Sequence, residues 1–263
     1  EPLYFKGSNA MEEQVTYKYD NYNLELTSRY RFSTGKRPLS DEVSFGGVLF
    51  REQYQKISDN KPSTPGPNEV DKNKFLAKVI YQKDHLDYDY FYLDGWHNSF
   101  HFQTVFTEGS NERFHVFFND LTYFNRIGRQ SNWANRFRLG LSTNRETPFA
   151  PFVLDNSINI RGVGNKIDRG TGTIVYNTEY RQTLFENEFG AIQGVGFADL
   201  GTWRQPGGNF RDFVEQKNFK FYGGGGIRLI YKPVYDAILR VDYSINLLEP
   251  SMSGFVIGLG QYF

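Results

Sequence analysis

The tripeptide Ile-Arg-Gly at residues 160–162 precedes two strand-like stretches, TIVYNTEYRQTLF at 173–185 and GVGFADLGTW at 194–203. Apolar and polar residues alternate in both stretches, and each carries one carboxylate, Glu179 or Asp199, on its less apolar side. A guanidinium presents five N–H donors in a rigid fork, so one arginine on a glycine-flanked loop can satisfy two carboxylates. The pattern therefore predicts that Arg161 contacts both carboxylates, although each charge alone is also typical of a solvated strand face.

Alternation with a period of two recurs along most of the chain, and almost no helical period is present. It is clearest at 237–247, where the apolar residues at 239, 241, 243 and 245 oppose Arg240, Asp242, Ser244 and Asn246. This pattern predicts an all-β protein. The expected strands are 15–34 (one strand, or a hairpin broken at Asn21), 43–57, 75–82, 86–93, 99–107, 114–124, 133–143, 173–185, 194–203, 218–232, 237–247 and 254–263.

Polar segments rich in Pro and Gly separate the expected strands. The clearest is 58–74 (SDNKPSTPGPNEVDKNK), which is predicted to be a long barrel loop rather than a linker, since too little chain precedes it to form another domain. A second long loop, 144–172, carries the Ile-Arg-Gly tripeptide. The KDH sequence at 83–85 predicts a short turn, and a change of phase near Asn119 predicts a β-bulge.

The composition favours a membrane barrel over a soluble domain. The chain has 25 Phe, 18 Tyr and 26 Gly, yet its mean hydropathy is −0.57. Transmembrane barrels place their apolar residues on the outer face and keep a polar interior. Charged residues recur on the less apolar side of the strands and are expected to pair in such an interior: Arg136, Arg138, Glu179, Arg181, Asp199, Arg228, Arg240 and Asp242. A soluble β-sandwich has the same period and remains the alternative.

The four glycines at 223–226 stand inside an expected strand. Glycine in a strand interior weakens the strand unless something packs closely against the backbone. A loop folded into the interior of a barrel would provide that packing.

Several classes of function lack support in the sequence. A formal net charge of zero gives no basis for nucleic-acid binding. The absence of cysteine excludes a disulfide framework and a thiolate metal site. The sequence contains no G-x-S-x-G, no H-E-x-x-H and no glycine-rich loop between a strand and a helix. We therefore predict that the chain is not an enzyme and that it needs no cofactor or metal.

Two groups of residues leave weaker alternatives open. His97, His101 and His115 could approach one another as metal ligands across a hairpin. Asp87 and Asp89 share one side of a strand and could act as paired carboxylates or bind calcium. A polar interior or interfacial face is the simpler interpretation of both groups.

The chain is predicted to hold one domain. Residues 1–10 (EPLYFKGSNA) resemble an altered protease-site tag and linker, so the predicted barrel domain comprises residues 11–263. No apolar run approaches the roughly 18 residues that a membrane-spanning helix requires.

The last residues carry a second motif. In GFVIGLGQYF, Phe255, Ile257, Leu259 and Phe263 are in phase, which resembles the terminal signal by which bacterial outer-membrane barrels are recognised for insertion. Together with Ile-Arg-Gly, TEYR and FADLG, this ending resembles the superfamily of BamA, TamA and the two-partner secretion transporters, also termed bacterial surface antigens. The resemblance covers roughly residues 157–263.

The resemblance implies roles for particular residues. In that superfamily an Arg-Gly loop plugs the barrel lumen, and its arginine contacts a Glu and an Asp of the two following strands. The matching residues here are Arg161, Gly162, Glu179 and Asp199. Members commonly have an aromatic residue after the Arg-Gly pair, where this chain has Val163.

The resemblance also implies a closed antiparallel transmembrane β-barrel with an inward-folded Arg-Gly loop, in the outer membrane of a Gram-negative bacterium. The chain has room for about 12 strands, whereas the superfamily usually has about 16. Members usually carry periplasmic domains ahead of the barrel, so a short relative and a part of a longer chain are both compatible. The last strand is expected to pair with a strand from 15–34, because an open edge in lipid is costly.

Two functions follow as hypotheses. The first is insertion or translocation of polypeptide clients, through a plugged lumen or through a seam between the first and last strands that pairs with a client strand. The alternative is a small pore, or a membrane anchor for an enzymatic or binding domain elsewhere. Both hypotheses make the lipid bilayer a partner, and neither involves nucleic acid.

Overall fold

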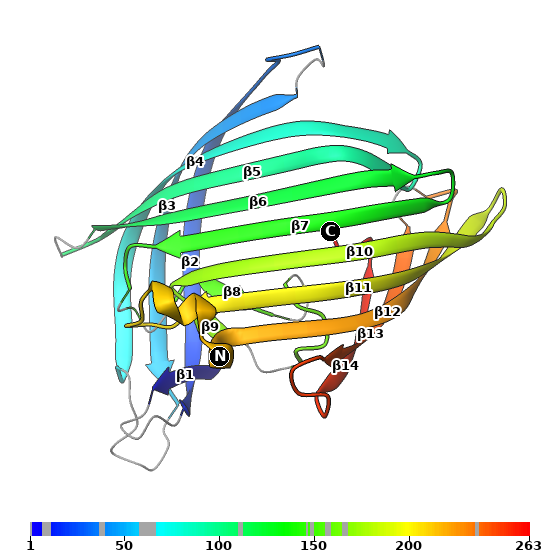
Figure 1. Cartoon of the computed structure of the whole chain (residues 1–263). Coiled ribbons are helices and arrows are strands. Elements are labelled where there is room, and N and C mark those ends of the chain that lie inside the picture. Colours follow the sequence, from blue (N-terminus) through cyan, green and yellow to red (C-terminus); the bar gives the residue numbers. More distant parts are fainter. Residues whose placement is uncertain are drawn as a thin grey trace.

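The computed structural model describes residues 2–6, 12–36, 40–57, 67–109, 113–145, 147, 150–155, 159–164, 168–234 and 237–263, with side chains from residue 17 onward. Twelve strands form one antiparallel sheet that curls into the wall of a barrel (Figure 1), and β8 and β9 form a separate hairpin. The all-β antiparallel fold predicted from the alternation is therefore confirmed. Within the described ranges, no helix is long and apolar enough to span a membrane.

The strands of the sheet lie in the order β1-β2-β3-β4-β5-β6-β7-β10-β11-β12-β13-β14. β1 falls in the stretch that the sequence predicts to be a tag remnant. The strands are β1 (Pro2–Lys6), β2 (Glu12–Phe32), β3 (Asp41–Lys56), β4 (Glu69–Asp89), β5 (Tyr92–Thr107), β6 (Arg113–Ile127), β7 (Ser131–Ser142), β8 (Phe152–Leu154), β9 (Asp168–Gly170), β10 (Gly172–Glu186), β11 (Gly190–Arg204), β12 (Phe219–Tyr231), β13 (Ile238–Asn246) and β14 (Ser253–Leu259). Two short 3₁₀ helices, η1 (Phe210–Val214) and η2 (Gln216–Asn218), lie between β11 and β12.

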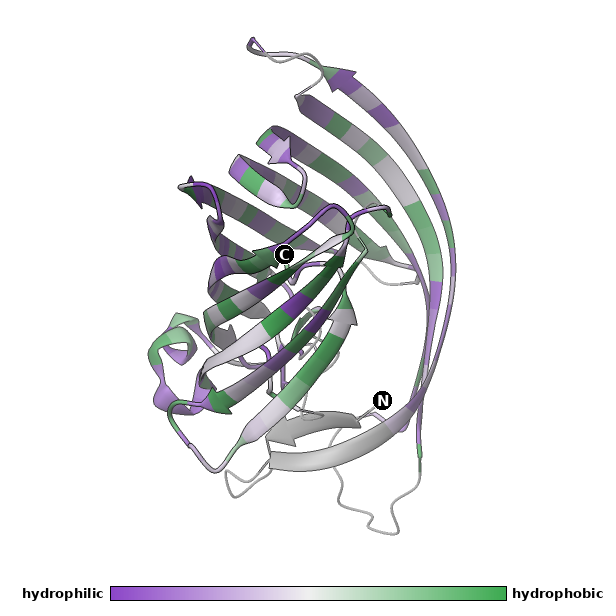
Figure 2. Cartoon of the chain, turned by 90° about the vertical axis from the view of Figure 1, so that its right-hand side faces the viewer, coloured by the Kyte–Doolittle hydropathy of each residue, from purple (hydrophilic) through white to green (hydrophobic). Residues whose placement is uncertain are grey.

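The buried face of the sheet is polar and its exposed face is apolar, which is the reverse of the arrangement in a soluble domain. Hydrophobic and hydrophilic residues alternate along the strands (Figure 2). On β10, Asn177, Glu179 and Arg181 are fully buried, while Tyr176 and Tyr180 on the opposite face are exposed. A soluble domain buries its apolar face, whereas a membrane barrel keeps a polar interior and exposes an apolar surface. The buried charges of this sheet therefore argue against the soluble β-sandwich.

The predicted boundaries of the first hairpins need correction. β2 is one continuous strand and is not broken at Asn21, and β4 already begins at Glu69, inside the predicted loop 58–74. Residues 58–66 of that loop lie outside the described residues. The predicted turn at 83–85 is also wrong, because β4 continues through it and turns at 90–91. The polar KDH run stays in the sheet because one face of this wall accommodates polar side chains, and His85 packs edge-on against Trp96.

The predicted bulge near Asn119 is absent. The register of β6 is continuous with both of its neighbours, from Phe106↔Arg113 to Gly95↔Phe124 on one side and from Val116↔Ser142 to Ile127↔Ser131 on the other. The change of phase has a different cause, namely an apolar residue on the inner face. The Phe118 ring lies 5.0 Å from the Arg138 guanidinium carbon and 6.3 Å from the ring of Phe152 on β8.

The predicted closure of the barrel by pairing of β14 with β2 is not observed. Among the described residues, β14 pairs only with β13, and β2 pairs with β1 and β3. All neighbouring strands from β2 to β14 are antiparallel, and these are eleven strands, so β2 and β14 run in the same direction. Direct pairing of these two strands would therefore be parallel, which the sequence period alone could not reveal.

The end of the chain departs from the predicted strand 254–263. β14 ends at Leu259, and Gly260 follows with a φ of +78°, a conformation that favours glycine. The chain then turns toward the buried face, where Phe263 packs near Phe124 at 6.5 Å between ring centroids. Phe263 is thus not in phase with the exposed apolar residues of β14. We call residues 260–263 the tail.

Candidate functional site

Three elements bring the predicted site residues together. Arg161 lies in the loop between β8 and β9, Glu179 lies on β10, and Asp199 lies on β11. β10 and β11 are paired with Asn177 opposite Asp199 and Glu179 opposite Phe197. Because side chains two residues apart on a strand share a face, this register places both carboxylates side by side on the buried face.

All three nitrogens of the Arg161 guanidinium donate to these carboxylates. Its Nε donates to Asp199 Oδ2 at 2.8 Å and its Nη2 donates to Asp199 Oδ1 at 2.9 Å, which is a two-pronged contact. Its Nη1 donates to Glu179, and its backbone N–H donates to Asp199 Oδ2 at 3.0 Å. All three side chains are fully buried. Such charge-assisted fork contacts are among the strong hydrogen bonds of proteins.

Two aromatic rings enclose the Arg161 guanidinium. Its central carbon lies 3.5 Å from the Phe197 ring centroid and 4.3 Å from that of Tyr262 in the tail. Phe197 has room because it packs over Gly224, where an added methyl group would lie 2.8 Å from Phe197 Cζ. The predicted packing on the glycine run 223–226 thus comes, at Gly224, from a neighbouring side chain.

Further charged residues extend the contact into a cluster. Arg181 Nε donates to Glu179 Oε1 at 2.6 Å, and Arg228 donates to Asp242 at 2.6 Å and to Glu179 at 3.3 Å. We define the arginine cluster as the five arginines and three carboxylates buried on this face: Arg136, Arg161, Arg181, Arg228, Arg240, Glu179, Asp199 and Asp242. The sequence predicts seven of these eight residues on the interior face of the strands, and it predicts Arg161 on the loop.

Gly162 lets the loop lie directly on β13 and β14. Its φ is +83°, and a methyl group at this position would lie 1.7 Å from the Ser244 hydroxyl oxygen. Ser244 Oγ donates to the Arg161 carbonyl at 2.8 Å, and Gly254 on β14 packs against Gly162. The Arg-Gly pair therefore contacts four of the five consecutive strands from β10 to β14, namely β10 and β11 through Arg161 and β13 and β14 through Gly162.

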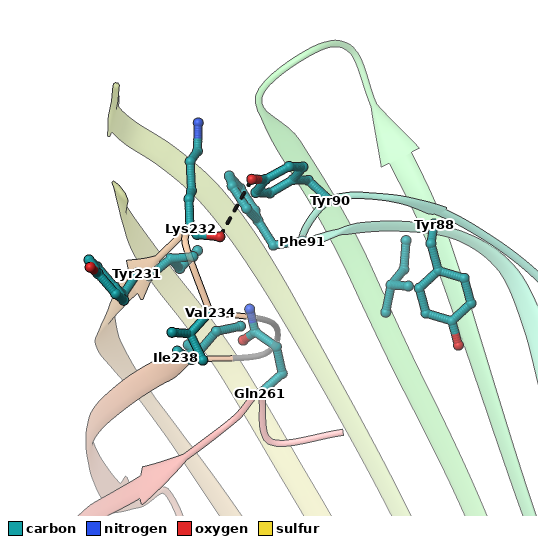
Figure 3. Close-up of a pocket in the computed structure, with 11 residues that line it drawn as sticks. Tyr88, Tyr90, Phe91, Tyr231, Lys232, Val234, Ile238 and Gln261 are labelled. Atoms are coloured by element: carbon teal, nitrogen blue, oxygen red, sulfur yellow. Dashed lines mark hydrogen bonds between the residues drawn. The ribbon is translucent and has the colours of Figure 1, made fainter. Parts of the chain in front are cut away.

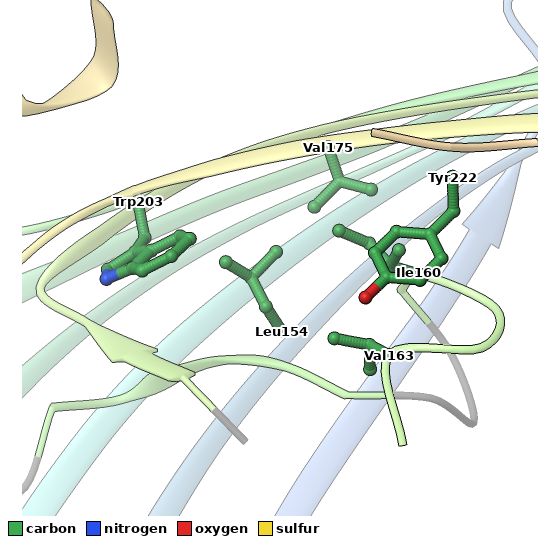
Figure 4. Close-up of a cluster of buried hydrophobic side chains, with 6 residues drawn as sticks. All are labelled: Leu154, Ile160, Val163, Val175, Trp203 and Tyr222. Atoms are coloured by element: carbon green, nitrogen blue, oxygen red, sulfur yellow. The ribbon is translucent and has the colours of Figure 1, made fainter. Parts of the chain in front are cut away.

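An apolar base supports the loop beside the arginine cluster. It consists of Leu154, Ile160, Val163, Val175, Trp203 and Tyr222 (Figure 4). Val163 is buried within this base, at the position where the superfamily commonly has an aromatic residue. Arg204 holds the two ends of the loop between β7 and β10 together. Its Nη2 donates to the carbonyls of Ser142 at 2.6 Å and Thr171 at 2.8 Å.

Sequence reasoning missed several residues of the site. Asn177 links the carboxylates to the loop, because its Nδ2 lies 2.8 Å from both Asp199 Oδ1 and the carbonyl of Asn159. The alternating pattern assigns no particular role to Ser244 or Phe197, and it places Tyr262 only within a terminal strand. The available signal for Tyr262 is Gly260, two residues before it, since glycine permits the turn that directs the tail inward.

The proposed insertion residues divide into two groups. Phe255, Ile257 and Leu259 are 69%, 71% and 82% exposed on the outer face of β14. Phe263 lies on the other side of the sheet, and its ring centroid is 5.6 Å from the Arg136 guanidinium carbon. The structure therefore groups the first three and separates Phe263 from them.

Residues of the histidine group and of the aspartate pair, which left metal binding and paired-carboxylate chemistry open, contact other side chains. His101 Nε2 lies 2.8 Å from Ser99 Oγ, and His115 Nδ1 lies 3.0 Å from Thr104 Oγ1. Asp89 pairs with Arg126. Among the described residues, no group of three potential metal-binding side chains occurs.

A separate apolar cavity of about 420 Å³ lies at one end of the sheet, between the β4–β5 turn and the β12–β13 turn (Figure 3). Tyr90 and Phe91 of the first turn approach Lys232 and Val234 of the second, and the Tyr90 hydroxyl donates to the Lys232 carbonyl at 3.5 Å. Gln261 of the tail also lines the cavity. The tail thus lies between this cavity and the arginine cluster.

The fold is shared with solved barrel structures. BamA from Haemophilus ducreyi lacking POTRA domains 1–3 superposes with a TM-score of 0.65 at 12% identity, over 91% of this chain and 53% of that chain. CdiB from Escherichia coli gives 0.61 at 10% identity, over 97% and 47%, and CdiB from Acinetobacter baumannii gives 0.59 at 15% identity, over 97% and 44%. The chain spans about half the length of each. No protein-family model and no curated protein sequence matches it.

These comparisons define the class of fold. The chain has the β-barrel fold of BamA and of CdiB, a two-partner secretion transporter. The resemblance predicted from the Ile-Arg-Gly and FADLG motifs is thereby confirmed at the level of the fold.

Proposed function

We propose that this chain is an outer-membrane β-barrel domain of a Gram-negative bacterium that inserts or translocates polypeptide clients. The observation that carries the proposal is the fully buried contact of Arg161 with Asp199 and Glu179. A pore that only conducts solutes has no evident use for a loop bound across four strands. A translocation barrel needs such a brace, because it must keep its lumen sealed while its wall changes shape.

In this proposal the loop between β7 and β10 is the lumen plug. Its Arg-Gly pair binds the wall through charge, and its Leu154 and Ile160 form an apolar cluster with Trp203 of the wall strand β11. Breaking a buried ion pair by removing one partner leaves an uncompensated charge. The plug is therefore held firmly in place, and its release requires the whole cluster to rearrange.

The client site is proposed to be the seam between β2 and β14. Beyond residues 12–16, which pair with β1, one side of β2 is open, and β2 runs in the same direction as the edge strand β14. A single strand running opposite to both would therefore pair antiparallel with each and close the barrel. Unpaired backbone groups in hydrocarbon are costly, and strand addition supplies main-chain hydrogen bonds with little dependence on sequence. A polypeptide client that forms β-strands matches both requirements. Two copies of this chain in the same orientation would bring β2 of one copy beside β14 of the other. These strands run in the same direction, so they could not pair antiparallel.

A bilayer experiment tests the plug and separates it from the alternative of a pore. The purified barrel and a variant in which a short Gly-Ser linker replaces residues 150–171 are compared by single-channel conductance. We expect low conductance for the intact barrel and a marked increase for the variant. High conductance of the intact barrel, unchanged by the deletion, would favour the pore.

A second measurement tests the client. A photo-reactive residue replacing Phe255, at the exposed edge strand β14, should cross-link to unfolded outer-membrane polypeptides but not to an equal amount of a soluble helical protein. Equal cross-linking to both would argue against a client site at the seam.

A further inference from the structure

The tail contacts every arginine of the arginine cluster. Gln261 receives hydrogen bonds from Arg228 Nε at 3.3 Å on its side chain and from Arg240 Nη1 at 2.8 Å on its carbonyl. Tyr262 covers Arg161, and its ring also lies 4.9 Å from the Arg240 guanidinium carbon. Phe263 receives a hydrogen bond from Arg181 Nη2 at 3.0 Å on its backbone oxygen, and its ring lies near Arg136.

These contacts make Tyr262 one of two walls around Arg161. The Phe197 wall is part of β11, so it stays with the sheet. The Tyr262 wall stands three residues beyond the end of β14, after the left-handed turn at Gly260. The position of Tyr262 is therefore set by β14, an edge strand that pairs on one side only among the described residues.

We propose that the tail is a clamp in which Tyr262 positions Arg161, so that the end of β14 and the Arg-Gly loop are released together. With Tyr262 in place, the guanidinium is enclosed on both faces and sealed from water, which strengthens its contacts with Asp199 and Glu179. Displacing the end of β14 withdraws Tyr262 and admits water to one face. The coupling between β14 and the Arg-Gly loop is a property of the folded chain. Its role in transport, where an opened seam would release the plug, rests on the proposed function.

The Tyr262 hydroxyl offers a sharp control. It forms no hydrogen bond within the described part of the chain. Tyr262→Phe therefore keeps the ring over Arg161 and should behave as the wild type, while Tyr262→Ala removes the wall. Tyr123→Ala, which removes an exposed ring from the outer face of β6, controls for the loss of an aromatic side chain elsewhere.

The test measures exposure of the loop by limited trypsin digestion of the folded barrel in detergent, with mass spectrometry of the bond after Arg161. We expect this bond to be protected in the wild type, Tyr262→Phe and Tyr123→Ala. In Tyr262→Ala it should be cut about tenfold faster or more, because a desolvated cation–π contact is lost. Equal protection of Tyr262→Ala and Tyr262→Phe would overturn the proposal.

A double-mutant cycle keeps the proposal testable if Tyr262→Ala folds poorly. Tyr262→Leu, which keeps an apolar side chain without a ring, is combined with Arg161→Lys, and the thermal midpoint is measured by heat-dependent gel mobility. The two substitutions share one contact, so their combined shift should be smaller than the sum of the single shifts. Additive shifts would show that Tyr262 does not act through Arg161. Either result stands independently of whether the barrel transports clients.

Discussion

Asp199 receives three hydrogen bonds from one residue, Arg161: from Nε at 2.8 Å, from Nη2 at 2.9 Å and from the backbone N–H at 3.0 Å. The side-chain pair fixes the guanidinium plane, and the backbone bond fixes the loop at the same carboxylate. Asp199 thus anchors both the charge and the chain of the Arg-Gly loop. The remaining Nη1 is left free to reach Glu179.

Removing the arginine should destabilise the folded barrel. Arg161→Ala leaves Glu179 and Asp199 buried with fewer cations, and we expect a loss of about 3–5 kcal/mol in the free energy of unfolding if the site is dry, and less if water enters. Arg161→Lys keeps the charge but loses the fork that serves two carboxylates, so it should fall between Ala and the wild type. Heat-dependent gel mobility measures both, with the exposed Arg211→Ala as control. An unchanged midpoint for Arg161→Ala would mean that the cluster does not hold the fold.

Gly162 and Gly164 form a matched pair for testing the close approach of the loop to β13. Both have a positive φ, +83° and +74°, but a methyl group at Gly162 would meet Ser244 whereas none of the surrounding atoms lies within 4 Å at Gly164. Gly164→Ala should show only the backbone strain, roughly 1 kcal/mol. Gly162→Ala adds the steric clash and should cost clearly more in a urea titration of the folded barrel. Equal costs would mean that the loop can move away from Ser244 freely.

The strongly alternating part of the sequence predicted its structure well. β10, β11 and β13 follow the predicted ranges within a few residues, because there each buried face is polar and each outer face apolar. The contact of Arg161 with Glu179 and Asp199 could be anticipated because a fork on a loop satisfies two carboxylates on neighbouring strands. Its function as a lumen plug stays a proposal.

Three features could not be predicted from the sequence, namely the position of the turn after β4, the direction of β2 relative to β14 and the inward path of the tail. The polar KDH run at 83–85 looks like a turn, but it pairs within a wall that tolerates polar residues on its inner face. The direction of β2 relative to β14 depends on the number of strands between them, so counting the continuous strand β4 as two strands reverses the result. The entry of the tail depends on a single φ angle at Gly260, which an alternating pattern of Leu259, Gln261 and Phe263 does not encode.

The outer face of β14 should be sensitive to charge. Ile257 is exposed at the middle of the strand, where the proposed barrel would meet lipid. Ile257→Lys is expected to cost about 2–4 kcal/mol near the bilayer midplane, and so to lower the yield of folded barrel in liposomes. Leu248→Lys, in the turn between β13 and β14, serves as control. Equal folding yields for the two variants would place β14 outside the lipid.

The direction of the seam gives the last prediction. The chain has no cysteine, so a cysteine placed at Phe255 or at Leu259 on β14 reports a single cross-link. The probe is a synthetic peptide with the sequence of β13, residues 238–246, carrying one cysteine at either its first or its fifth position. If the added strand runs opposite to β14, the cysteine at the start of the peptide should form a disulfide with position 259. The cysteine at the fifth position of the peptide should then react with position 255, because only cross-strand neighbours come within disulfide distance. The reverse pattern would indicate parallel addition, and it would remove the reason for expecting a single strand to close the sheet between β2 and β14.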